Sequence, residues 1–166
     1  MHLGSRAVDL DRPLLVGILN LTPDSFSDGG TLPDLDAVLR RAEAMRLDGA
    51  DLLDLGGEST RPGAGEVPTD LELERVLPAV EALRTRVDLP LSVDTRRALV
   101  AREALRQGAV MVNDVSGFGD PGMGEVVAAA GAAWVLMHMP HPVGDMAAAR
   151  RTGAMPTELG AGLERI

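Results

Sequence analysis

The chain alternates short apolar runs with longer amphipathic segments, and it does so five times within 166 residues. The apolar runs have the length of strands and carry polar residues or glycine at or beside their ends; they span 14–20, 51–56, 90–95, 110–115 and 134–138. In 35–45, the first segment between them, apolar residues recur at three- and four-residue spacing, and Gly49 follows as a helix stop. Strands that alternate with helices predict a parallel sheet joined by right-handed crossovers.

Two architectures fit this alternation, an open doubly wound sheet and a closed barrel. Polar residues stand at or beside the carboxyl ends of the apolar runs: Asn20, Asp54, Asp94, Asn113, Asp114 and His138. In a barrel these ends converge on one mouth, whereas a doubly wound sheet gathers its polar residues at one switch point. The sequence also contains no G-x-G-x-x-G and no P-loop pattern after the first run. We therefore predict an α/β fold of the parallel (β/α)8 TIM-barrel type.

A full barrel of this type takes about 250 residues, so the chain is about three β/α units short. The prediction is a single domain over 1–166, an incomplete barrel of about five β/α units, truncated at its C-terminal side. The first apolar run, 14–20, is expected to be buried on both faces, as parallel strands are. Asp70 is a candidate cap of the second helix, and Pro78 is expected to break or kink that helix.

Composition argues against several classes of partner. The formal net charge of -9 repels nucleic-acid phosphates and anionic membranes at long range. Aromatic residues make up only 2% of the chain, so rings that stack on bases are scarce. There is no cysteine, no basic-then-apolar leader and no apolar run of the ~18 residues that a membrane span needs. We expect a cytoplasmic protein that binds neither nucleic acid nor membranes.

The first apolar run leads into a long polar loop, and residues 17–30 read GILNLTPDSFSDGG. Connections between strands and helices commonly take about 2–6 residues, so a longer loop with hydroxyls and carboxylates suggests binding. Asn20 and Asp28 supply the hard oxygens that hold Mg²⁺ together with a substrate phosphate. The structural alternative is that Asn20 caps the strand end and Asp28 begins a turn.

The second loop, 57–65, is rich in glycine, which lets the backbone approach a ligand closely. Thr60 and Arg61 lie in this loop, and the planar guanidinium of Arg61 suits a carboxylate or a phosphate. A surface salt bridge is the alternative role for Arg61.

Three residues at later strand ends are further candidates. Asp94 follows an apolar strand, where a carboxylate is costly unless a donor or a cationic ligand meets it; alternatively, it caps the helix that starts near Arg96. Asn113 carries both a donor and an acceptor and suits the amide-like edge of a heterocycle, or it satisfies neighbouring backbone. Met137 is either a core residue or a shelf for a ligand.

These stretches together resemble one family. The motifs GILNLTPDSFSDGG, DLGGESTRPGA, SVDT, VNDVSG and LMHM stand in the order and spacing of dihydropteroate synthases, enzymes of the folate pathway. The resemblance runs along the whole chain but covers only the first five of that family's eight barrel units. It implies that 6-hydroxymethyl-7,8-dihydropterin pyrophosphate condenses with p-aminobenzoate, releasing pyrophosphate and giving 7,8-dihydropteroate, with Mg²⁺ helping to bind the pyrophosphate.

The resemblance also assigns roles by motif. It implies that Asn20 and Asp28 meet the metal and the pyrophosphate. The p-aminobenzoate pocket would be shaped by residues of the two loops: Phe26, Thr60, Arg61 and Pro62.

On the pterin side, the resemblance implies that Asp94 and Asn113 hold the pterin and that Met137 packs on its ring. Loss of pyrophosphate leaves positive charge on the exocyclic carbon of the pterin, and a nearby carboxylate stabilises that charge as it develops. Asp94 and Arg61 are therefore the predicted catalytic residues. The amine of p-aminobenzoate is the nucleophile, so no covalent enzyme intermediate is needed.

The chain departs from the family pattern on its C-terminal side. The family also uses a pterin-binding Asp on the sixth strand, a Lys in a later loop and an Arg-x-His near its end, and this sequence contains no Lys. Two alternatives therefore stay open, a barrel of the methyltetrahydrofolate methyltransferase type and an inactive fragment or binding module that needs a partner. A homodimer is expected only if the full-length chain is present.

Overall fold

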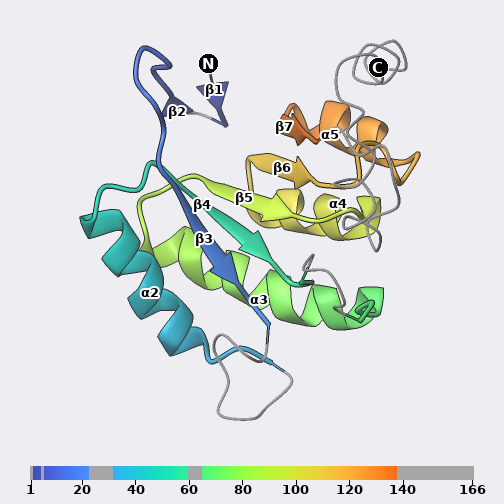
Figure 1. Cartoon of the computed structure of the whole chain (residues 1–166), viewed down its shortest axis with the longest axis horizontal. Helices are drawn as coiled ribbons and strands as arrows, with labels where there is room; N and C mark the ends of the chain where they lie inside the picture. The colour runs from blue at the N-terminus through green and yellow to red at the C-terminus, as the bar shows by residue number, and fades with distance from the viewer. Residues whose placement is uncertain (1, 5, 23–31, 60–64, 138–166) are drawn as a thin grey trace, which may run out of the picture.

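The computed structural model describes residues 2–4, 6–22, 32–59 and 65–137. Its main feature is a parallel sheet whose strand order follows the chain, β3-β4-β5-β6-β7 (Figure 1). The strands are β3 (Val16–Asn20), β4 (Leu52–Gly56), β5 (Leu91–Asp94), β6 (Met111–Asp114) and β7 (Ala133–Leu136). Sequential parallel pairing is the pattern of a β/α barrel, so the predicted fold class, an incomplete barrel of this type, is confirmed.

Within the described ranges, four helices connect these strands and lie on one face of the sheet (Figure 1). They are α2 (Leu35–Leu47), α3 (Thr69–Arg86), α4 (Ala98–Gln107) and α5 (Met123–Ala130). The core between helices and sheet is aliphatic, and its fully buried side chains include Leu19, Leu55, Val80, Val93 and Val112. Since the helices cover this outer face, the opposite inner face is the one that would line a barrel.

Local sequence sets where the helices begin and end. The carboxylate of Asp34 accepts a hydrogen bond from the N–H of Asp36 and so caps the start of α2. Gly108 and Gly131 follow α4 and α5 with φ angles of 115° and 59°, a left-handed conformation that glycine adopts without strain.

The expected break of α3 at Pro78 and the expected cap at Asp70 are both wrong. The helix runs unbroken from Thr69 to Arg86 with Pro78 inside it. Proline removes one backbone hydrogen bond, but the neighbouring residues Ala79 and Val80 are completely buried, and their packing outweighs that loss. Asp70 is not the cap, because it lies within the first helical turn and the N-cap position is Pro68.

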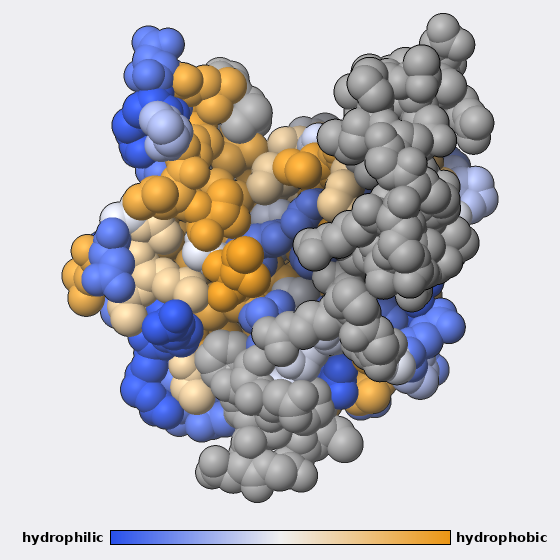
Figure 2. All heavy atoms as spheres, viewed as in Figure 1, coloured by the Kyte–Doolittle hydropathy of each residue, from blue (hydrophilic) through white to orange (hydrophobic). Residues whose placement is uncertain are grey.

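The expectation that the first apolar run is buried on both faces is also wrong. Gly17 and Leu19 face the helices and are buried, whereas Val16 and Ile18 on the inner face are 47% and 61% exposed. Five strands do not curl far enough to bring opposing side chains onto this face. Figure 2 shows apolar surface on this side of the molecule, and Val16 and Ile18 of β3 are exposed on the inner face.

The N-terminal residues form a small hairpin that the sequence patterns do not predict. Strand β1 (His2–Leu3) pairs antiparallel with β2 (Arg6–Ala7). Leu3 packs with Leu52 and Met111 on the inner face in a second, smaller apolar cluster. The hairpin therefore covers the amino-terminal end of the inner face. None of the helices in the described ranges is long and apolar enough to cross a membrane.

Candidate pterin site at the strand ends

Four residues from four strands stand in one row across the carboxyl edge of the sheet. Asn20 pairs in register with Gly56, Gly56 with Asp94, and Asp94 with Asn113. Paired residues of neighbouring strands point to the same face, so the three side chains share the inner face. A Cβ atom on Gly56 would lie 3.6 Å from Oδ2 of Asp94 and 3.9 Å from Oδ1 of Asn20. Glycine at 56 therefore leaves room in which the side chains of Asn20 and Asp94 approach one another.

A second polar pair lies one step deeper on the same face. Asp54 pairs in register with Ser92, and both residues are buried. The Nδ2 group of Asn113 donates a hydrogen bond of 2.9 Å to Oδ2 of Asp54, which fixes the orientation of the Asn113 amide. Among the described residues, Oδ1 of Asp54 and Oγ of Ser92 have no hydrogen-bond partner. Hydrogen-bonding capacity thus remains below the row, where buried polar atoms are normally satisfied.

Asp94 has an unusually high pKa for an aspartate. Burial is the largest cause that raises its pKa to about 7, and the negative charges of Asp54, Glu72, Asp114 and Glu58 add to it. A carboxyl that titrates near neutrality in a polar cleft is typical of functional sites. Asp94 does not cap the following helix, because the first N–H of α4, on Ala98, donates to Asp120 at 2.8 Å.

The remaining predicted site residues fall into two groups. Met137 follows β7, is partly buried, and donates its backbone N–H to the carbonyl of Asp114 at 3.2 Å, so it lies beside the row at the edge of the sheet. Five predicted residues, together with His138, lie outside the described residues: Phe26, Asp28, Thr60, Arg61 and Pro62.

Asp114 does not join the row, although it ends a strand. Its carboxylate accepts hydrogen bonds from the N–H and hydroxyl of Ser116, at 2.9 and 2.6 Å, and from the N–H of Phe118 at 3.2 Å. It therefore holds the turn after β6, in which Phe118 has a positive φ of 73°. The convergence expected of all the strand-end polar residues is wrong for Asp114, because alternation along β6 places it on the face opposite Asn113.

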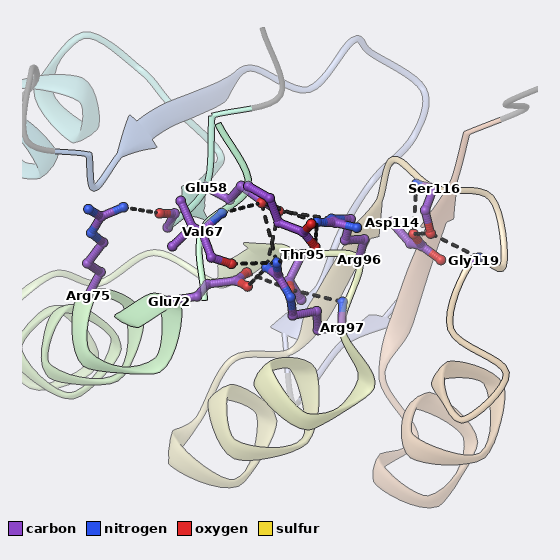
Figure 3. A network of polar contacts seen from close by, with 12 residues as sticks. Glu58, Val67, Glu72, Arg75, Thr95, Arg96, Arg97, Asp114, Ser116 and Gly119 are labelled. Carbon is purple, nitrogen blue, oxygen red and sulfur yellow. Dashed lines mark hydrogen bonds and ion pairs between the residues drawn. The ribbon is translucent and has the colours of Figure 1, made fainter. Parts of the chain in front are cut away.

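Sequence reasoning missed a network of charged residues next to the row (Figure 3). Glu58, after β4, accepts hydrogen bonds from Nε of Arg96 at 3.0 Å, Nη1 of Arg97 at 3.1 Å and the N–H of Val67 at 3.0 Å. Burial opposes ionisation of Glu58, but the hydrogen bonds from Arg96 and Val67 keep its pKa below the usual value. Arg97 also forms an ion pair with Glu72, which is completely buried in α3.

The one sequence signal for this network is the pair Arg96-Arg97 directly after the SVDT motif. On its own, such a pair reads as part of a solvated surface, because arginine is seldom buried unless it is paired. The acidic partners come from elements 25 and 39 residues away, which local patterns do not connect.

The described residues contain no group of three His, Asp or Glu side chains that could hold a metal ion. Asn20 is the described member of the predicted metal pair, and its Oδ1 would lie 3.9 Å from a Cβ atom on Gly56. A single amide oxygen at an exposed strand end fits Mg²⁺, which commonly takes one or two protein oxygens and completes its shell with water and phosphate.

Parallel strands in chain order, helices on one face, and polar side chains converging at the carboxyl edge define a class. Such proteins are β/α-barrel proteins with a ligand site at the strand ends. Within this class the chain belongs to the pterin-binding enzyme family, because the family model described as pterin binding enzyme matches residues 16–159. The resemblance noted from the motifs is thereby confirmed.

Similar proteins agree on one activity. The chain is 47% identical over 133 residues to the dihydropteroate synthase of Escherichia coli K12, an alignment covering 80% of this chain and 47% of that one. The Yersinia pestis dihydropteroate synthase with a sulfonamide drug complex has a TM-score of 0.88 at 43% identity, covering 99% of this chain and 60% of that one. The Burkholderia cenocepacia enzyme complexed with 7,8-dihydropteroate has a TM-score of 0.70 at 48% identity, covering 81% and 44%. The chain therefore spans about half the length of the curated relatives it matches.

Proposed function

We propose that this chain acts as a dihydropteroate synthase, which joins 6-hydroxymethyl-7,8-dihydropterin pyrophosphate to p-aminobenzoate. The observation that carries the proposal is the row at the carboxyl edge, where Asn20, Asp94 and Asn113 share one face. The solved relative from Burkholderia cenocepacia is complexed with 7,8-dihydropteroate, the product that this reaction would form. The site would belong to one pterin-binding domain over 1–166, in a cytoplasmic protein.

The pterin would bind against Asp94 and Asn113, with Met137 beside its ring. The bond between Asn113 and Asp54 uses the Nδ2 group of Asn113, so its Oδ1 would accept from a ring N–H. Asp94, as a carboxylate, would accept a second N–H and stabilise positive charge on the exocyclic carbon as the bond to pyrophosphate breaks. The amine of p-aminobenzoate then forms the new carbon–nitrogen bond and loses one proton.

The pyrophosphate would leave on the side of Asn20, which with Asp28 would hold Mg²⁺. The bound ion would supply positive charge that makes pyrophosphate a better leaving group. The p-aminobenzoate pocket would be formed by Phe26, Thr60, Arg61 and Pro62. Arg61 would supply the positive charge that meets an anionic group. These residues follow β3 and β4, whose ends form the Asn20–Gly56 pair of the row.

The direct test is turnover by the purified chain supplied with both substrates and Mg²⁺. We expect pyrophosphate release that depends on p-aminobenzoate, together with dihydropteroate formation. Asp94→Asn should lower the rate by about 100-fold or more, as loss of a preorganised charge commonly does. Glu103→Gln, which breaks an exposed ion pair with Arg106 on α4, should leave the rate unchanged. Pyrophosphate release that is independent of p-aminobenzoate, without dihydropteroate, would contradict the proposal.

One observation favours a second candidate, a module that binds a pterin without turning it over. Val16, Ile18 and Val135 on the inner face are 47%, 61% and 45% exposed, so this face is less covered than a barrel lumen. Pterin binding by calorimetry without dihydropteroate formation would favour the module, and its missing units would then come from a partner.

A further inference from the structure

Thr95, the residue directly after Asp94, is 3% exposed and forms hydrogen bonds with α3, with β6 and with Arg97, the residue before α4. Its hydroxyl donates a hydrogen bond of 2.7 Å to Oε1 of Glu72 in α3. Its N–H donates to the carbonyl of Asn113 in β6 at 3.1 Å. Its hydroxyl oxygen accepts from the N–H of Arg97, before α4, at 3.2 Å. The backbone that carries Asp94 is therefore fixed immediately beyond its side chain.

Glu72 occupies a place where helix packing alone gives no reason for a carboxylate. It is 0% exposed, and charged residues are almost never fully buried unless they are paired. Its Oε2 pairs with Nη1 of Arg97, and Nη2 of Arg97 donates to the carbonyl of Val67 at 2.6 Å. A buried ion pair is often no more stabilising than well-packed apolar residues, so Glu72 calls for a role other than stability.

The close-up of this region shows Thr95, Glu72 and Arg97 gathered at the point where β5 gives way to α4 (Figure 3). Arg97 also reaches Glu58 at 3.1 Å, so the ends of β4 and β5 are held by one guanidinium. The two strands that supply Gly56 and Asp94 to the row are thus fixed relative to one another at that edge.

We propose that Glu72, acting through Thr95 and together with Arg97, positions the Asp94 carboxylate for the pterin. This inference rests on the proposed function, because it concerns the affinity of the same site. Glu72, Thr95 and Arg97 act through Asp94 and are positioning residues. A displaced carboxylate would bind the N–H groups of a flat ligand poorly, since hydrogen bonds weaken steeply as their angles depart from linearity.

The test compares Thr95→Val, which removes the hydroxyl at nearly constant volume, with Thr95→Ser, which keeps it. Binding of 6-hydroxymethyl-7,8-dihydropterin pyrophosphate with Mg²⁺ is measured by calorimetry on the full chain. We expect about tenfold weaker binding for Thr95→Val, the effect of one lost hydrogen bond, and binding within about twofold of wild type for Thr95→Ser. Thr85→Val is the matched control, because its hydroxyl bonds only the α3 carbonyls of Glu81 and Ala82 among the contacts shown.

The outcomes separate this inference from the proposed function. If wild type binds the pterin and Thr95→Val binds it equally tightly, the positioning role is contradicted and the proposed function stands. If wild type binds no pterin, both are contradicted. A purely structural role would reduce the folded fraction, seen by circular dichroism and as a lower stoichiometry, and would leave the dissociation constant of the folded molecules unchanged. Arg97→Lys, which keeps the charge but lacks the planar fork, should weaken binding in the same direction.

Discussion

The outer and inner faces of the sheet are made of the same five strands but differ in composition and cover. The outer face carries aliphatic side chains such as Leu19, Leu55 and Val93, all completely buried under the helices. The inner face carries Ile18, which is 61% exposed, and beside it the polar row around Asp94. The outer face of the strands therefore supplies most of the packing that stabilises the fold, and the inner face carries the candidate site. Substitutions that differ only in the face they occupy should separate the two.

The largest expected effect comes from neighbouring residues of β3. Leu19→Ala should lower the free energy of unfolding by about 3 kcal/mol, because it leaves a cavity in the outer core. Ile18→Ala should lower it by less than about 1 kcal/mol, because the side chain is 61% exposed. Urea denaturation of both variants measures the difference. Equal losses would contradict the contrast between the faces.

The second prediction concerns the folding free energy that the buried carboxyl of Asp94 costs. The pKa of Asp94 is raised to about 7 from 3.8, mainly by burial, so the folded chain keeps a proton that the unfolded chain releases above about pH 4. The stability that this group contributes is therefore present at low pH and is lost as the pH rises through 7. The difference corresponds to at most about 4 kcal/mol.

Asp94→Asn should therefore stabilise the fold at pH 8 by on the order of 2 kcal/mol, since the amide keeps part of the burial cost. The gain should vanish below about pH 3, where Asp94 is neutral in both the folded and the unfolded state. Urea denaturation at the two pH values measures it, and pterin binding should be lost throughout. A gain that is the same at both pH values would show that charge is not the cause.

The smallest expected effect compares two glycines. A Cβ on Gly17, on the outer face, would meet Sδ of Met45 at 2.8 Å and Cδ2 of Leu53 at 2.9 Å. Gly17→Ala should therefore cost about 1–2 kcal/mol through overpacking. Gly56→Ala meets only ordinary contacts with Asp94 and Asn20, at 3.6 and 3.9 Å, and should cost less in stability while weakening pterin binding. The reverse ranking of stabilities would argue against the assignment of the faces.

The elements and the row were predictable because both depend on local patterns. Apolar runs ending at Asn20, Asp94 and Asn113 indicate strand ends, and parallel order brings strand ends to one edge. The exposure of Ile18 was not predictable, because it depends on which strands lie opposite it on the inner face, and local sequence does not specify them. The role of Glu72 was hidden for a related reason. It lies in an amphipathic helix where a glutamate is expected to be solvated, and its partners Thr95 and Arg97 are 23 and 25 residues away.

The central claim is that a pterin binds at the edge formed by Asn20, Gly56, Asp94 and Asn113. The most direct measurement is an NMR titration of the ¹⁵N-labelled chain with 6-hydroxymethyl-7,8-dihydropterin pyrophosphate and Mg²⁺, followed by backbone and side-chain amide shifts. We predict that the largest shifts fall on these four residues and on the side-chain amide of Asn113, with α2 and α5 unaffected. Shifts confined to the helical outer face, or none at the four residues, would contradict the account.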